Sequence, residues 1–130
     1  MKEIYITVWT KKGKQELAKD QWYKFNTKQL HRLNGPAVEQ ADGTKWWYVN
    51  GKLHRTDGPA YESADGTKYW CINGKLNRLD GPAVEYADGT KVWWIDDKAL
   101  NTKEVETWWE ENKVDLKEPE GQMAFKLRWL

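Results

Sequence analysis

LHRLNGPAVEQADGTKWWYVNGK at residues 30–52 is followed, without a gap, by LHRTDGPAYESADGTKYWCINGK at 53–75 and LNRLDGPAVEYADGTKVWWIDDK at 76–98. The three copies share one Leu, one Arg, Gly-Pro-Ala, one Glu, Asp-Gly-Thr-Lys and one Trp at corresponding positions. A short fixed period is typical of stacked copies of one small structural unit, each burying its apolar side against its neighbours. The chain is therefore a repeat array, and its function must lie on the surface of that array.

Turn signals divide each copy into short strands. Asp42-Gly43 and Asn50-Gly51, like their counterparts in the other copies, favour the positive φ angles of tight hairpin turns. The intervening segments, 36–41 and 44–49, have strand length and contain Val, Thr, Tyr and Trp. We therefore predict a mainly β fold, in which tandem antiparallel β-hairpin repeats form an elongated twisted sheet with one C-terminal α-helix and terminal capping strands.

The segments outside the array are predicted to cap it within a single domain, residues 1–130. We assign residues 1–29 to an N-terminal cap and half-repeat, 30–52, 53–75 and 76–98 to the repeats, and 99–130 to a C-terminal cap of helix and strand. Residues 3–10 are predicted as a strand, and residues 22–26 resemble residues 46–50 of the first copy. Asn101 or Thr102 can cap a helix that ends near Asn112. Alternating apolar residues predict a closing strand over residues 122–130.

Composition narrows the class of protein. Cys71 is the only cysteine, which excludes an internal disulfide and favours a reducing compartment, so we expect a cytoplasmic protein. No apolar stretch has the length of a signal peptide or membrane span, and we expect no membrane partner.

The net charge of +1 conceals a basic leading end, since residues 1–32 hold eight Lys or Arg against three Asp or Glu. A block of this kind is compatible with nucleic acid, an acidic partner or an ordinary solvated surface.

The array also resembles a known repeat family. Asp-Gly-x-x-aromatic followed by Asn-Gly-Lys, in tandem at this period, resembles the MORN-type repeat (membrane occupation and recognition nexus). Leu-His-Arg-x-Asp-Gly-Pro-Ala resembles a tryptophan-rich variant associated with phages and large viruses. The resemblance covers residues 30–100 and implies successive antiparallel hairpins that act as a scaffold or interaction surface without intrinsic catalysis. It further implies a phage setting in the host cytoplasm, as an anti-defence inhibitor of a host protein or as a small virion component.

Strand parity separates an invariant face from a variable one. Trp47, Trp70 and Trp93 recur in every copy, so we interpret them as a scaffold ladder between adjacent copies. The alternate positions differ between copies, and a repeat protein can place specific contacts there. The candidate partner-binding residues are therefore Trp46, Tyr48, Tyr69 and Trp94. The alternative is that this variable face is a second half-buried face covered by the terminal segments.

The chain carries no recognisable catalytic or metal-binding signature. No nucleophile, base and orienting group stand at a known spacing, and Asn77 replaces the His of the first two copies, so we predict no enzyme, metal or cofactor. The leading hypothesis is a rigid repeat sheet that binds a protein partner through aromatic and charged side chains. The alternatives are a small-ligand or nucleotide-binding protein that uses stacked aromatic rings, and a small virion structural component. An exposed edge strand would also allow pairing with a second copy.

Overall fold

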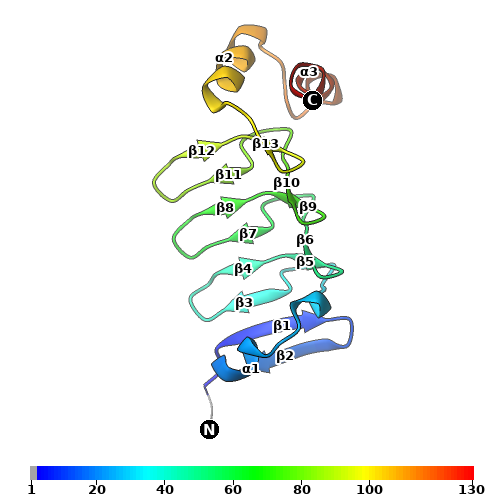
Figure 1. Ribbon diagram of the computed structural model, residues 1–130, viewed down its shortest axis with the longest axis vertical. Coiled ribbons are helices and arrows are strands. Elements are labelled where there is room, and N and C mark those ends of the chain that lie inside the picture. The colour runs from blue at the N-terminus through cyan, green and yellow to red at the C-terminus, as the bar shows by residue number, and fades with distance from the viewer. Residues whose placement is uncertain (1–2) are drawn as a thin grey trace.

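The protein is a rod of stacked hairpins. A computed structural model describes residues 3–130, and Figure 1 shows the three copies stacked along the long axis between two caps. The strands run across the rod, and the two chain ends lie at its opposite ends. Each internal copy therefore has one neighbour above it and one below.

Each copy contributes one hairpin to a continuous eight-stranded sheet. These hairpins are β3 (Val38–Gln40) with β4 (Lys45–Trp46), β7 (Tyr61–Glu62) with β8 (Lys68–Tyr69), and β11 (Val84–Glu85) with β12 (Lys91–Val92). Two N-terminal strands, β1 (Ile6–Thr10) and β2 (Gly13–Leu17), complete the sheet. The strand order is β12-β11-β8-β7-β4-β3-β1-β2, and every neighbouring pair is antiparallel. The predicted fold class, a mainly β protein of tandem antiparallel hairpins, is confirmed.

A second, smaller hairpin leaves the large sheet in every copy. It is formed by β5 (Tyr48–Val49) and β6 (Lys52–Leu53), by β9 (Cys71–Ile72) and β10 (Lys75–Leu76), and by β13 (Trp94–Ile95) and β14 (Lys98–Ala99). Residues 44–49, expected as one strand, divide at Trp47. Its N–H donates to the Ala60 carbonyl of the next copy at 2.7 Å, whereas its carbonyl accepts from the N–H of His54 at 3.0 Å. The chain thus changes hydrogen-bonding partner at the invariant Trp.

The Asp-Gly-Thr-Lys turn gives each of its residues a structural role. In the first copy, Asp42 Oδ1 accepts from the N–H of Thr44 at 2.9 Å, and Gly43 has a φ of +96° that favours glycine. The hydroxyl oxygen of Thr44 then accepts from the N–H of Ala64 in the next copy at 3.1 Å. Lys45 lies opposite a glutamate on each neighbouring strand. The stacking of copies therefore accounts for the recurrence of this turn.

The N-terminal cap begins the large sheet. It consists of β1 (Ile6–Thr10), β2 (Gly13–Leu17), α1 (Lys19–Tyr23) and the 3-10 helix η1 (Thr27–Gln29). Its buried cluster comprises Ile6, Val8, Leu17, Leu30, Ala37 and Val38. Residues 22–26 do not form a strand like that of a half-copy, because the Gln21 side chain accepts from the N–H of Ala18 at 2.8 Å and begins α1. Trp9 of β1 instead lies beneath an invariant Arg, as the repeat tryptophans do.

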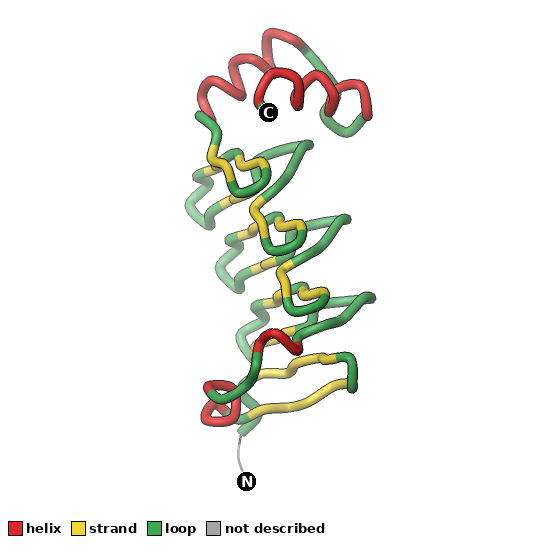
Figure 2. Tube along the Cα trace, turned by 45° about the vertical axis from the view of Figure 1, so that its right-hand side comes forward, coloured by secondary structure: helices red, strands yellow, loops and turns green. Residues whose placement is uncertain are grey.

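The first helix of the C-terminal cap is α2 (Thr102–Asn112), which confirms the helix predicted over 102–112. The side chain of Asn101 caps it by accepting from the N–H of Glu104 at 3.0 Å. Val105 is fully buried in a cluster with Trp93, Ile95, Leu116 and Phe125. Figure 2 shows that the longer helices gather at this end of the rod, where they close the array.

The second helix, α3 (Pro119–Trp129), corrects the strand predicted over 122–130. The alternating pattern was misleading, because Met123 and Leu127 are 60% and 79% exposed. The inward residues are instead spaced by four: Gly121 and Phe125 are buried and Trp129 is half-buried. Proline in the first turn and a run of residues with high helix propensity favour a helix here. Within residues 3–130, no helix is long and apolar enough to cross a membrane.

Candidate functional site

The large sheet presents two different rows of side chains. Cross-strand register aligns Val8, Val38, Trp46, Tyr61, Tyr69, Val84 and Val92 in one row. The adjacent position along the strands carries alternating charges, from Glu39 through Lys45, Glu62, Lys68 and Glu85 to Lys91. Successive residues of a strand point to opposite faces, so the two rows lie on opposite sides of the sheet. Two glutamates of the charged row pair with invariant arginines: Glu39 lies 4.0 Å from Arg32 and Glu62 lies 3.4 Å from Arg55, which gives this row a role within the fold itself.

Four aromatic side chains, Trp46, Tyr61, Tyr69 and Tyr86, form what we call the aromatic row. Their ring centroids are 4.2 Å, 4.9 Å and 6.4 Å apart in that order. These separations are typical of aromatic contacts. The first three rings are half-buried and Tyr86 is 43% exposed. The row therefore joins the three copies and still meets solvent.

The predicted binding residues fall into two groups. Trp46 and Tyr69 belong to the aromatic row, where Tyr61 lies between them. Tyr48 and Trp94 lie on the small-hairpin strands β5 and β13, and both are half-buried. Tyr48 packs with Trp46 against the N-terminal core. The structure thus packs Trp46 and Tyr48 against the same core, and Tyr61 links Trp46 to Tyr69.

Burial also sets the acid–base state of this region. Desolvation raises the pKa of the Tyr48 and Tyr69 phenols, so both remain neutral hydrogen-bonding groups. Cys71, which corresponds to Tyr48 in the second copy, is buried, and this burial raises the pKa of its thiol to about 11. A thiol with so little thiolate at neutral pH is a poor nucleophile and a poor metal ligand.

Sequence reasoning missed Tyr61 and Tyr86 as members of the aromatic row. They lie at or beside the first strand of their copies, whereas the parity argument compared only second strands. Consecutive antiparallel hairpins place the first strand of each copy beside the second strand of the copy before it. Aligning Tyr61 with Trp46 on that basis is the signal that could have found the row.

On the opposite face, the guanidinium of each invariant Arg lies over the ring of the Trp of the preceding unit. The guanidinium carbon is 3.9 Å from the ring centroid for Arg32 over Trp9, 4.0 Å for Arg55 over Trp47 and 3.8 Å for Arg78 over Trp70. Such cation–π contacts contribute about 0.5–2 kcal/mol, depending on how far they are desolvated. Trp93 ends the series and meets Phe125 and Trp109 of the C-terminal cap instead.

Hydrogen bonds hold each guanidinium in this position. In the second copy, Arg55 donates to the Pro59 carbonyl at 3.1 Å and pairs with Asp57 at 2.9 Å and Glu62 at 3.4 Å. A Cβ on Gly58 would come within 2.9 Å of the Arg55 guanidinium carbon, so only glycine leaves room for this arrangement. The invariant Arg, Gly, Pro and Glu thus form one set of contacts.

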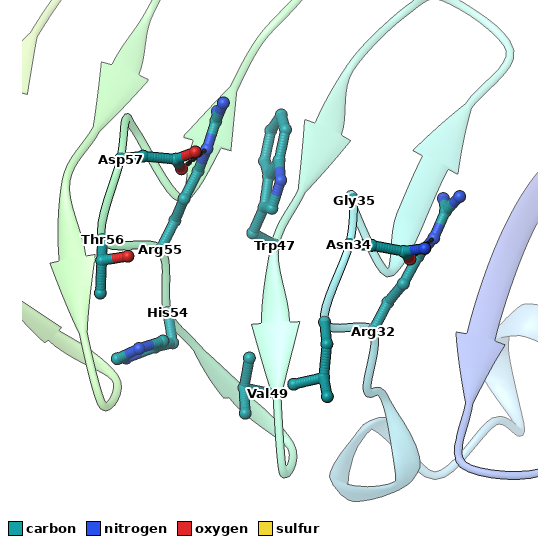
Figure 3. Close-up of a pocket in the computed structure, with 10 residues that line it drawn as sticks. Arg32, Asn34, Gly35, Trp47, Val49, His54, Arg55, Thr56 and Asp57 are labelled. Carbon is teal, nitrogen blue, oxygen red and sulfur yellow. Dashed lines mark hydrogen bonds and ion pairs between the residues drawn. The ribbon is translucent and has the colours of Figure 1, made fainter.

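Two grooves separate the Arg-containing loops of neighbouring copies. The first, of about 520 Å³, lies between the loops that carry Arg32 and Arg55, with Trp47 and Val49 in its wall. Figure 3 shows the indole of Trp47 between these two arginines. The second, of about 480 Å³, repeats this geometry one copy further with Trp70 in its wall. Arginines and aspartates line both grooves, so their charge is mixed.

The repeated histidines make structural hydrogen bonds. Nδ1 of His31 accepts from the N–H of Asn50 at 2.9 Å, and Nδ1 of His54 accepts from the N–H of Asn73 at 3.0 Å. In the third copy the side-chain oxygen of Asn77 accepts the equivalent bond, from Asp96 at 3.1 Å. In the part of the chain from residue 3 onward, no cluster of His, Cys, Asp and Glu side chains suits a metal ion.

Comparison of the chain with protein-family models, curated proteins and solved structures finds no match.

Proposed function

We propose that this chain is a non-catalytic interaction protein whose repeat sheet binds a protein partner. The observation that carries the proposal is the aromatic row, which is continuous across the copies, meets solvent and varies between copies. The candidate surface comprises Trp46, Tyr48, Tyr69 and Trp94, to which we add Tyr61 and Tyr86. Aromatic residues dominate protein–protein hot spots, since they bury a large area at low cost in conformational entropy.

The main alternative is a small-ligand or nucleotide site in the grooves, which bring tryptophans and arginines together. Two features favour the protein partner over this alternative. One side of each groove indole is already covered by a guanidinium, and the guanidinium charge is already paired, as at Arg55 with Asp57 and Glu62. A base or sugar ring would have to displace these contacts in order to stack.

We place this activity in the host cytoplasm, in a phage-like setting in which the partner is a host or defence protein that the chain inhibits. The support is the MORN-like repeat pattern of residues 30–100 and the single unpaired cysteine. A role as a small virion component uses the same surface but predicts a phage structural protein as the partner.

The test pairs binding with folding. Affinity purification and mass spectrometry identify the partner, and each variant then receives a binding isotherm and a melting curve. We expect Tyr69→Ala and Tyr86→Ala to weaken binding by about 2 kcal/mol at a hot spot. The melting temperature should change little for the exposed Tyr86, whereas Tyr69→Ala should also lower it, because the Tyr69 ring contacts Tyr61 and Tyr86. The matched control is Tyr23→Ala, since Tyr23 is 75% exposed and lies outside the row.

Equal affinities for Tyr86→Ala, Tyr69→Ala and the Tyr23→Ala control would contradict the proposal. Binding of nucleotides to the grooves, detected by tryptophan fluorescence and abolished by Trp47→Ala, would favour the small-ligand alternative instead.

A further inference from the structure

The N-terminal cap contains a pocket of about 330 Å³ that uses no residue of the aromatic row. Three separate segments form it: the turn after β1 supplies Lys11 and Lys12, η1 supplies Lys28 and Gln29, and the turn between β5 and β6 supplies Asn50. We call it the lysine pocket. Its residues come together only when the cap packs on the first copy.

The charge of the lysine pocket has one sign. Lys11, Lys12 and Lys28 line it, and no Asp or Glu does. Over residues 3–130, these three amines form no ion pair. The grooves between copies differ, because their arginines face Asp57 or Asp80. Three unpaired ammonium groups around one cavity create a site that attracts anions.

Neutral donors complete the lining. Nδ1 of His31 accepts from the N–H of Asn50 at 2.9 Å, which leaves the imidazole proton on Nε2. The side-chain amides of Gln29 and Asn50 make no hydrogen bond within the described residues and retain their donors. The pocket therefore offers amide and imidazole donors beside three cations, and an oxyanion with several acceptor oxygens matches that chemistry.

One wall of the pocket is rigid. The N–H of Gly51 donates to the Leu30 carbonyl at 2.8 Å, and a Cβ on Gly51 would come within 2.5 Å of the Lys28 carbonyl oxygen. The turn between β5 and β6 therefore lies directly on the backbone of η1. Asn26 also fixes η1, because its side chain accepts from the N–H of Lys28 at 3.1 Å. A wall fixed in this way lowers the entropic cost of binding.

We propose that the lysine pocket binds a compact phosphate-type oxyanion, such as the di- or triphosphate group of a small molecule. Phosphate oxygens accept several charged and neutral hydrogen bonds at once, and lysine is a common phosphate ligand. A nucleic acid strand fits less well. The neighbouring grooves carry the carboxylates of Asp57 and Asp80, which would repel a continuous phosphate backbone.

The experiment titrates the full chain with inorganic pyrophosphate in buffered salt and follows backbone amide shifts by NMR. We expect the shifts to centre on residues 10–12, 28–31 and 50. The triple variant Lys11→Gln, Lys12→Gln, Lys28→Gln should weaken pyrophosphate binding by about tenfold or more. The matched control, Lys52→Gln, Lys75→Gln, Lys98→Gln, removes the same charge from exposed lysines of the three small hairpins and should change affinity by less than about twofold.

A further probe identifies the kind of molecule that carries the phosphate, and two results would overturn the proposal. A nucleoside triphosphate that binds more tightly than pyrophosphate, with the same lysine dependence, would place the oxyanion in a nucleotide. Equal losses in the two triple variants would reveal diffuse charge attraction and overturn the proposal. The proposal would also be overturned if pyrophosphate caused no change in the amide chemical shifts of the pocket residues. This holds even if a single-stranded oligonucleotide did change those shifts.

Discussion

Trp70 illustrates how one residue joins two copies. Its N–H donates to the Ala83 carbonyl of the next copy at 2.8 Å, and its carbonyl accepts from the N–H of Asn77 at 3.0 Å. The guanidinium of Arg78, also from the next copy, lies 3.8 Å from its ring centroid. The backbone and the ring of this residue therefore serve the same junction.

We expect Trp70→Ala to destabilise the protein by about 3 kcal/mol or more, since the central junction loses a large ring and the surface beneath Arg78. The measurement is urea unfolding followed by circular dichroism. Tyr86→Ala, which removes an exposed ring, is the control and should cost less than about 1 kcal/mol. A midpoint for Trp70→Ala within error of the parent would show that the Trp ladder is not a scaffold.

His54 and Asn77 show that two residue types can fill one position. Each uses a side-chain acceptor to bind the backbone N–H of the small-hairpin turn. We expect His54→Asn to preserve stability within about 0.5 kcal/mol, whereas His54→Ala, which leaves the N–H of Asn73 without this partner, should cost about 1 kcal/mol. Thermal unfolding of both variants tests this. If His54→Asn were as damaging as His54→Ala, the imidazole would have a role beyond this bond.

At the scale of elements, the Asp-Gly-Thr-Lys turns of the large sheet make the stability of the fold depend on pH. The pKa of Asp65 is lowered from the usual 3.8 by hydrogen bonds from the Ser63 hydroxyl and the N–H of Thr67. Hydrogen bonds from Thr44 and Thr90 lower the pKa of Asp42 and Asp88 in the same way. A lowered folded-state pKa means that the unfolded chain binds more protons. The stabilisation is therefore present above the unfolded pKa and is lost as pH falls through the folded pKa.

We expect Asp65→Asn to lose less stability than the parent between pH 7 and about pH 3, because the amide oxygen still accepts both hydrogen bonds and no longer titrates. Urea midpoints at the two pH values measure this. Glu106→Gln is the control, since it removes the same charge from an exposed position on α2. Identical acid sensitivity in Asp65→Asn and the parent would exclude this turn as a source of the pH dependence.

The elements also show what could be predicted from sequence and why. The 23-residue period and the Asp-Gly turns were sufficient to predict the large sheet from the sequence. An N-cap residue followed by apolar residues at helical spacing was sufficient to predict α2. The strand prediction at α3 was wrong because alternation counts apolar residues without knowing their burial, and two of the alternating residues face solvent. The break at Trp47 depends on partners in two different hairpins, which no local pattern reveals.

Sequence also predicted only part of the candidate sites. Parity placed Trp46 and Tyr69 on one face, but Tyr61 joins them only through the register between copies. The lysine pocket unites residues 11–12, 28–29 and 50, which share no period, so folding alone brings them together.

The whole molecule behaves as a one-dimensional stack, in which each internal copy contacts the units on either side. We expect that inserting a second copy of residues 53–75 after residue 75 gives a folded, monodisperse protein, longer by about 10 Å for two added strands. Its unfolding midpoint should rise, since one more junction forms. Small-angle scattering and urea unfolding provide the two measurements.

The matched control inserts the same copy with its Trp and Arg replaced by Ala. This control should lower the midpoint below that of the parent, because neither junction of the inserted copy has the Arg–Trp contact, and the original contact of Trp70 with Arg78 is lost. If the two insertions gave equal stability, the contacts described at each junction would not be the ones that hold the copies together.

The placement of the chain ends has a mechanical consequence. Hydrogen bonds between antiparallel strands run perpendicular to the strands, and here the strands lie across a rod with one terminus at each end. Tension applied between the termini would therefore pull along these bonds and open them a few at a time, as in a zipper, instead of loading a whole ladder in shear. The rod would unfold at low force, one copy after another, so that under load it would act as an extensible tether.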